Sequence, residues 1–338
     1  MKSKNYKSTV IWTLILVVLF AFIVDCSKGS NDSRQSKFIV VAGGYYVEPG
    51  KDTSNISNKA AYSEDGIQWF ETTMPRGSIT WDSVSYGNGK FVAINIRKAA
   101  YSDDGIKWLE AIMPDNIGWE TICYGNGKFV AVSWGNKAAY SKDGSKWEIT
   151  TLYSRAKWES ICYGNGKFVA VSNRDESDLN NRGSKKAAYS ADGINWKPAT
   201  LPRAEWHCVC YGNGKFVAIS DYAYSTNVVA YSQDGINWNE TRMPDGEERW
   251  YNVCYGKDKF VAVALGSDKV AYSYDGIKWK TATLPDKMSG YRVCYGNDKF
   301  VVVTSDSDKA AYSADGINWK TATLPSKADW HRVCYGGD

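Results

Sequence analysis

The stretch YSADGINW, residues 312–319, decides the fold of this 338-residue chain, because it is one of seven copies of a YSxDGxxW pattern. The Asp-Gly pair in each copy favours the tight turn of a β-hairpin. Successive serines of the pattern lie between 39 and 49 residues apart, a spacing typical of four-stranded repeat units. The serines are Ser63, Ser102, Ser141, Ser190, Ser232, Ser273 and Ser313.

Two further segments recur upstream of each hairpin, and both read as strands. The first resembles WETICY and begins at residues 81, 119, 158, 206, 250, 290 and 330. The second resembles FVAV and follows a GNGK-type turn, beginning at residues 38, 91, 129, 168, 216, 260 and 300. With the two strands of the hairpin, each copy supplies four strands. The pattern therefore predicts an all-β, seven-bladed β-propeller of four-stranded blades over residues 37–338.

The two ends of the repeat region complement each other. The region begins at Phe38 with a copy of the FVAV-type segment and ends with a copy of the WETICY-type segment that starts at Trp330. One blade therefore has to be formed by strands from both ends of the region. We expect the N- and C-terminal strands to pair and close the ring, because an open ring would leave two unpaired strand edges. The 15 Trp and 23 Tyr, most of them at repeat positions, are expected to pack between blades.

The hairpin motif resembles the Asp-box, or BNR, repeat of sialidase-like propellers, although the usual motif has one more residue between Asp and Gly. In that family the Ser and Asp side chains bind the hairpin backbone and the Trp packs beneath it. The resemblance implies a structural role for the aspartates and not an acid or base role. These residues are Asp65, Asp104, Asp143, Asp192, Asp234, Asp275 and Asp315.

The first 36 residues differ from the repeats. Three lysines precede an apolar run from Val10 to Val24, which is short for a spanning helix and typical of an export signal. Residues 1–25 are therefore interpreted as a signal and membrane-targeting segment, and residues 26–36 as a flexible tether. Cys26 resembles the lipid-modified cysteine of bacterial lipoproteins, although Asp25 stands where a small residue is usual. The alternatives are an uncleaved signal anchor and secretion with an unrelated cysteine.

Metal, cofactor and nucleic-acid functions have no support in the sequence. The only histidines, His207 and His331, hold one repeat position in different blades, and no CxxC or HxxxH cluster exists. The net charge of +4 comes mostly from the first 36 residues, so the nearly neutral repeat region has no general attraction for nucleic acid. We expect no metal and no cofactor. Six cysteines at one position of the first strand are interpreted as small buried side chains.

Sialidase-like catalysis is also not expected. The resemblance would require three arginines around a carboxylate, with a Tyr/Glu nucleophile pair and an Asp acid. Only Arg292 and Arg332 are equivalent residues on adjacent first strands, and no Tyr/Glu pair accompanies them. No catalytic residue is therefore assigned.

The variable loops are the predicted place for a ligand. The loops after the second and fourth strands share one face of the disk, and they carry aromatic residues outside the repeat positions. These residues are Tyr45, Tyr46, Trp134, Tyr153, Tyr222 and Tyr224.

The sequence thus predicts an exported, membrane-tethered propeller that acts as a non-enzymatic binding or scaffolding module. Its partner is an unknown protein or carbohydrate on the variable-loop face, and the membrane is reached through the N-terminus. We expect an extracytoplasmic location, either anchored to the cell membrane as a lipoprotein or secreted. The alternative is a glycan-active protein, either a lectin or a sialidase-like glycosidase. Fold alone does not decide between these functions.

Overall fold

The computed structural model describes residues 35–43, 58–75, 80–115, 117–176, 183–220, 227–244, 246, 248–285, 288 and 291–337. Within these residues every regular element is a strand. The described part of the chain contains no helix that is long and apolar enough to cross a membrane. The predicted signal, most of the tether and Cys26 lie outside the described residues. The strands are β1 (Lys37–Ala42), β2 (Lys59–Ser63), β3 (Phe70–Thr73), β4 (Ser83–Gly87), β5 (Lys90–Ile94), β6 (Lys98–Ser102), β7 (Leu109–Ile112), β8 (Trp119–Gly125), β9 (Lys128–Ser141), β10 (Glu148–Gly164), β11 (Lys167–Arg174), β12 (Ser184–Ser190), β13 (Lys197–Ala204), β14 (Trp206–Gly212), β15 (Lys215–Ser220), β16 (Val228–Ser232), β17 (Asn239–Arg242), β18 (Trp250–Gly256), β19 (Lys259–Ala264), β20 (Lys269–Ser273), β21 (Lys280–Thr283), β22 (Arg292–Gly296), β23 (Lys299–Val303), β24 (Ser307–Ser313), β25 (Lys320–Ala328) and β26 (Trp330–Gly336).

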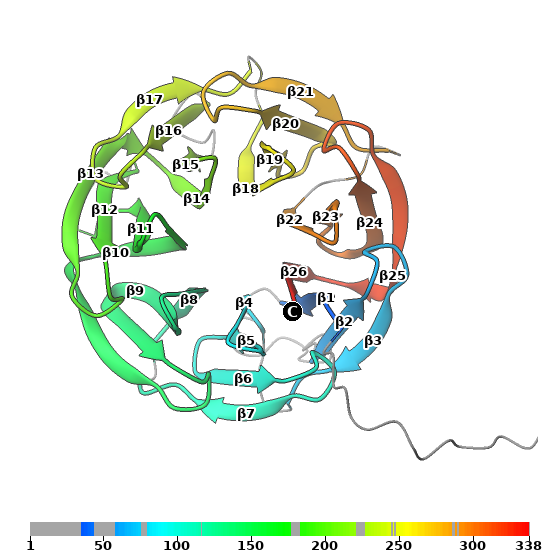
Figure 1. The fold of residues 1–338 in the computed structure, drawn as a ribbon, viewed down its shortest axis with the longest axis horizontal. Coiled ribbons are helices and arrows are strands. Elements are labelled where there is room, and N and C mark those ends of the chain that lie inside the picture. Colours follow the sequence, from blue (N-terminus) through cyan, green and yellow to red (C-terminus); the bar gives the residue numbers. More distant parts are fainter. Residues whose placement is uncertain are drawn as a thin grey trace, which may run out of the picture. The chain divides into compact units, whose positions relative to one another are not determined.

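The described strands form antiparallel sheets arranged as a β-propeller (Figure 1). In each sheet the first strand of a repeat lies toward the centre and the fourth lies at the outside, as β14 and β17 show in Figure 1. Five sheets have four strands, in the orders β26-β1-β2-β3, β4-β5-β6-β7, β14-β15-β16-β17, β18-β19-β20-β21 and β22-β23-β24-β25. The prediction of an all-β propeller with four-stranded blades is confirmed.

The predicted number of seven blades is wrong, because the described strands form six sheets. The sixth sheet has six strands, in the order β13-β12-β11-β10-β9-β8, and contains two copies of the sequence repeat. Its β10 is unbroken over 17 residues: the part up to Lys157 pairs with β9, and the part from Lys157 onward pairs with β11. In the other sheets, loops separate the second strand from the third and one copy from the next. In this sheet the corresponding residues pair with each other, with Ala156 opposite Gly135, so the hydrogen bonding continues from one copy into the next.

The predicted closure of the ring is confirmed. Strand β26 pairs with β1, from Lys37 opposite Gly336 to Ala42 opposite Trp330. The indole of Trp330 is fully buried in a cluster that also contains Phe38 of β1, in the same sheet, and Val301 of β23, in the neighbouring sheet. Closure therefore joins the two ends of the repeat region through both backbone pairing and core packing.

The repeated turns form because their residues tolerate left-handed backbone conformations. In the GNGK turn of β4 and β5, Asn88 has φ of 48° and Gly89 has φ of 70°, which suits a two-residue hairpin turn. The Asn88 amide also donates to the carbonyl oxygen of Lys142 in a neighbouring hairpin (3.3 Å), and Asn297 donates to Glu64 across the closure (2.9 Å). The GNGK turns and the YSxDG hairpins therefore lie on one face of the ring, which is held together by these bonds.

The opposite face is built from the remaining connections, and we call it the rim face. Here a residue that follows the FVAV-type segment donates to the residue before a first strand: Trp134 N, within β9, bonds Gly118 O (3.0 Å), and Gly43 N, directly after β1, bonds Asp329 O (2.8 Å). These bonds hold the start of β8 and of β26 in place. The variable loops and the first residues of the inner strands therefore share the rim face.

Candidate binding site at the rim of the ring

One position of the inner strand varies in chemistry while its neighbours repeat. It directly follows the Trp that begins the first segment of the repeat, or Gly290 in the one copy that lacks this Trp. In all seven copies the side chain at this position is polar. Glu159 is buried at this position, and the other six residues are half-buried. The inner strands that carry this position lie around the centre of the ring (Figure 1), and side chains at this position on adjacent strands contact or influence one another. We call the set the polar ring: Asp82, Glu120, Glu159, His207, Tyr251, Tyr291 and His331.

Three consecutive members of the polar ring are carboxylates and form an acidic arc. Burial, and then the charge of Glu159, raise the pKa of Glu120 to about 7. Burial raises the pKa of Asp82 to about 6, although the Thr80 hydroxyl donates to that carboxylate (3.0 Å). Two acids of this arc thus titrate close to neutral pH, because carboxylates crowded in a poorly solvated site resist full ionisation.

Glu159, the third acid of the arc, behaves differently because Lys157 and His207 lie beside its carboxylate. Burial acts to raise the pKa of Glu159, but Lys157 and His207 outweigh burial and hold it below its ordinary value. Lys157 Nζ lies 2.9 Å from one carboxylate oxygen, and His207 Nδ1 lies 3.8 Å from the other. The acidic arc therefore keeps one ionised carboxylate and two that can exchange a proton near pH 6 to 7.

The other four members form an aromatic arc of rings in mutual contact. The His207 and Tyr251 ring centroids are 4.8 Å apart, Tyr251 stacks on Tyr291 at 5.2 Å, and Tyr291 meets His331 edge-on at 5.4 Å. Asn173 fixes the His207 ring through a 2.9 Å hydrogen bond to Nε2. Acidic and aromatic chemistry thus occupy different sectors of one ring.

The residues that directly follow the polar-ring position form hydrogen bonds to the neighbouring inner strand. Ser160 Oγ accepts a hydrogen bond from Val209 N (3.1 Å), and Asn252 Oδ1 accepts one from Val293 N (2.8 Å). In two copies this position is an arginine: Arg292 Nε donates to His331 O (3.2 Å), and Arg332 Nε donates to Asp82 O (3.1 Å). This layer fixes the distance between inner strands and places two guanidinium groups beside the aromatic arc.

The cysteine positions of the inner strand are not reactive centres. Seven cysteines are free thiols within the described residues. Burial raises the pKa of all six thiols at the equivalent position, so they stay un-ionised and lack the thiolate that metal binding and nucleophilic attack require. No group of three or more His, Cys, Asp or Glu side chains in the described part of the chain is arranged to hold a metal ion. The six thiols are Cys123, Cys162, Cys210, Cys254, Cys294 and Cys334.

Two of the six aromatic residues predicted to bind a ligand fall within the described residues. Trp134 is 56% exposed and Tyr153 is 39% exposed, and both lie where β9 and β10 pair on the rim face. Lys157 Nζ lies 5.8 Å from the centre of the Trp134 ring, so the exposed indole adjoins the acidic arc through one lysine. Tyr45, Tyr46, Tyr222 and Tyr224 lie outside the described residues.

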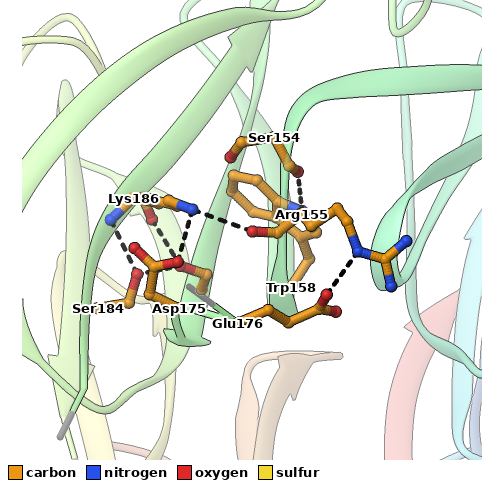
Figure 2. Close-up of polar contacts among 8 residues, drawn as sticks. Ser154, Arg155, Trp158, Asp175, Glu176, Ser184 and Lys186 are labelled. Carbon is orange, nitrogen blue, oxygen red and sulfur yellow. Dashed lines mark hydrogen bonds and ion pairs between the residues drawn. The ribbon is translucent and has the colours of Figure 1, made fainter. Parts of the chain in front are cut away.

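An ionic cluster lies next to these aromatics and joins β10 to β11 and β12 (Figure 2). Arg155 Nε lies 2.6 Å from a Glu176 oxygen, and Lys186 Nζ lies 2.7 Å from an Asp175 oxygen. Lys186 also donates to the carbonyl oxygen of Arg155 (3.0 Å). The acidic residues 175 and 176 are therefore engaged in ion pairs, which leaves the neighbouring exposed rings as the available contact surface.

The hairpin aspartates bind their own turns. Asp65 Oδ1 accepts hydrogen bonds from Ile67 N and Gln68 N, both at 2.8 Å, and Ser63 Oγ accepts one from Gly66 N at 2.8 Å. The same set recurs at every copy, with two backbone donors to each carboxylate. These bonds favour the ionised form and hold the pKa of each aspartate below its ordinary value, although burial acts in the opposite direction.

The sequence reasoning did not recognise the polar ring. It noted that His207 and His331 are equivalent, and that Arg292 and Arg332 are equivalent. The two histidines were not combined with the three acids and two tyrosines at the same repeat position, to which the two arginines are adjacent. The signal was present: a position that is polar in every copy but different in charge, between positions that hardly change.

Comparisons with known proteins show the fold and leave the function open. No family model and no curated protein matches the sequence. Among solved structures, a streptogramin B lyase matches with a TM-score of 0.64 and 8% identity over 87% of this chain and 90% of that chain. Virginiamycin B lyase from Staphylococcus aureus matches with a TM-score of 0.64 and 11% identity over 73% and 85%. YCF48 bound to a D1 peptide matches with a TM-score of 0.59 and 15% identity over 87% and 91%. All three are β-propellers, as this chain is.

Proposed function

We propose that this protein is a non-enzymatic binding or scaffolding propeller that holds a charged segment of a partner protein at the rim face. The polar ring is the observation that carries the proposal. The scaffold positions of the repeat hardly change from copy to copy, whereas this position places three acids in one sector and aromatic rings in another. A site with separated charges at the centre of a rigid ring suits the recognition of one polar segment.

The neighbouring solved structures are compatible with this role. One of them, YCF48, is a propeller with a bound peptide. The lyases among the neighbours have the same fold and a different function, so the fold supports neither role by itself. The Asp-box resemblance adds the expectation of a rigid scaffold, since its aspartates act within turns.

A photo-crosslinking experiment tests the site. A benzophenone amino acid replaces Trp134 on the rim face or, as the control, Lys142 in a hairpin on the other face. We expect a partner adduct from position 134 only, and we expect Glu120→Gln combined with Asp82→Asn to reduce it, because an anchor residue contributes about 1 kcal/mol or more. Equal adducts from both faces, or an adduct insensitive to the acidic arc, would show that the polar ring is not the site.

The second candidate is a lectin, favoured by Trp134 and Tyr153. Exposed aromatic rings stack on sugar rings, and Trp134 is the most exposed tryptophan among the large apolar side chains that the structure describes. A glycan array with the wild type and with Trp134→Ala distinguishes the two. Glycan binding that is lost in Trp134→Ala while the crosslinked adduct is absent would favour the lectin.

We further propose that the propeller is exported and anchored to a membrane through lipidated Cys26. The support is the order of lysines, apolar run, cysteine and polar tether in the first 36 residues. Metabolic labelling with a fatty-acid analogue tests this. We expect label in the wild type and none in Cys26→Ala; equal labelling of both, or no label in either, would contradict lipidation.

A further inference from the structure

Arg292 is a buried cation held in a fixed orientation. Its guanidinium packs against two stacked tyrosine rings of the aromatic arc, with the guanidinium carbon 4.5 Å from the centre of Tyr251 and 4.9 Å from that of Tyr291. The residue is only 3% exposed. Together with the Nε bond to His331 O, the two rings leave the guanidinium little freedom to turn.

The hydrogen-bonding capacity of Arg292 is mostly unused. Among the described residues, Nε has the only hydrogen bond of this guanidinium, and no carboxylate lies within ion-pair distance. A buried charge is normally paired, because an unpaired one loses its hydration without compensation. The tyrosine faces compensate for part of this loss, but they provide no acceptor for the two terminal nitrogens.

A second cation lies beside it. Arg332 holds the equivalent position on the next inner strand and likewise uses only Nε among the described residues, in its bond to Asp82 O. Burial, and then the charge of Arg292, lower the pKa of Arg332. Burial, followed by the charges of the two arginines, holds the pKa of His331 well below its ordinary value, so His331 is neutral. Two positive charges are therefore placed on adjacent inner strands, and no carboxylate among the described residues lies within ion-pair distance of either guanidinium.

We propose that Arg292 and Arg332 form a binding site for a carboxylate group of the partner segment. A guanidinium presents its donors in a planar fork that matches the two oxygens of a carboxylate. This inference rests on the proposed function and names the chemistry of one end of the bound segment.

The charge of the surrounding ring favours a monoanion over a phosphate. Glu159 lies near enough to affect the titration of both Arg292 and Arg332. The ionised Glu159 carboxylate would repel a doubly charged phosphate strongly. It would repel a ligand carboxylate less, because that group carries one negative charge. A positive group on the same segment would in turn be attracted to the acidic arc.

A protection experiment on the wild-type full-length chain, purified in a mild non-ionic detergent, tests the site without a mutation. Phenylglyoxal modifies accessible arginines, and mass spectrometry measures the modification of Arg332, which is half-buried, and of the more buried Arg292. Three probes are compared at constant ionic strength: N-acetyl-dialanine with a free carboxylate, its C-terminal amide, and N-acetyl-Ala-Asp-Ala amide. Protection by the first probe identifies a C-terminal carboxylate as ligand, and protection by the third identifies a side-chain carboxylate. Protection by neither, or equal protection by the uncharged amide, would overturn the inference.

Variants supply the matched control. Arg292→Lys and Arg332→Lys keep the charge but lose the fork, and Arg97→Lys changes an exposed arginine in a loop. We expect calorimetric affinity for the protecting probe to fall roughly tenfold or more in the first two and to stay unchanged in the third. Equal affinity in all four proteins would contradict the site. If probe binding is absent while crosslinking from position 134 still depends on the acidic arc, only the carboxylate inference fails and the proposed function stands.

Discussion

At the scale of single residues, equivalent positions of this repeat divide into two kinds. The hairpin aspartate has the same structural role in each copy, because its carboxylate accepts hydrogen bonds from two backbone N–H groups of its own turn. At the polar-ring position no pair of bonds from backbone N–H groups recurs from copy to copy among the described residues, so its side chain can change without damage to the turn or the strand. Positions of the second kind are free to specify a ligand, and their titration then depends on their neighbours in the ring.

Glu120 is the residue whose titration has the clearest consequence. Its folded pKa of about 7 lies above the ordinary value of 4.5, since burial and Glu159 disfavour its charge. The protonated form therefore stabilises the fold fully below pH 4.5, and this contribution is lost as pH rises through about 7. Glu120→Gln removes the ionisation, so we expect its melting temperature to fall less between pH 5 and pH 8 than that of the wild type.

The size of this effect and its control can be stated. The raised pKa corresponds to a stability difference on the order of 1 to 3 kcal/mol, or a few degrees in melting temperature for a chain of this size. Glu240→Gln, on an exposed outer strand, should leave the profile unchanged. If the profiles of Glu120→Gln and the wild type coincide, the carboxyl is not perturbed as described.

At the scale of elements, a glycine at the end of each inner strand controls how closely two strands approach. A Cβ at this position would lie 1.9 to 2.1 Å from the Cγ of a tyrosine on the next inner strand, far inside van der Waals contact. The ring of the following copy therefore packs directly on the glycine backbone. The pairs are Gly87 with Tyr124, Gly125 with Tyr163, Gly164 with Tyr211, Gly212 with Tyr255, Gly256 with Tyr295, Gly296 with Tyr335, and Gly336 with Tyr86 across the closure.

Gly212→Ala tests this packing. The added methyl group would overlap the Tyr255 ring, with 1.9 Å between Cβ and Cγ, so the two inner strands have to separate. Overpacking of this kind costs about 1 to 3 kcal/mol. We expect a lower midpoint of urea unfolding. Gly118→Ala is the matched control, since no atom lies within 4 Å of its Cβ position, and similar midpoints for both variants would contradict the packing argument.

At the scale of the whole molecule, the strand that closes the ring couples the two ends of the repeat region. Deletion of residues 330–338 removes the partner of β1, the buried Trp330 and the glycine that packs on Tyr86. Burial of a large side chain such as Trp330 contributes about 1.5 to 3 kcal/mol, and β1 would be left as an open edge. We expect the truncated protein to aggregate or to melt far below the wild type in calorimetry. Removal of Asp338 alone is the control, and a truncation that melts within a few degrees of it would refute closure by the shared sheet.

Local sequence by itself determined the strands, the turns and the closure of this protein. Asn-Gly and Asp-Gly pairs fix hairpins within a few residues, as at Asn88 and Gly89, and the complementary ends of the repeat region leave one way to avoid open edges. The tertiary structure alone decided the number of sheets, because β9 and β10 merge two repeat copies through pairing between loop residues such as Gly135 and Ala156. It alone also assembled the polar ring. Glu120 and Arg292 are far apart in the chain, and only the convergence of inner strands places their charges around one centre.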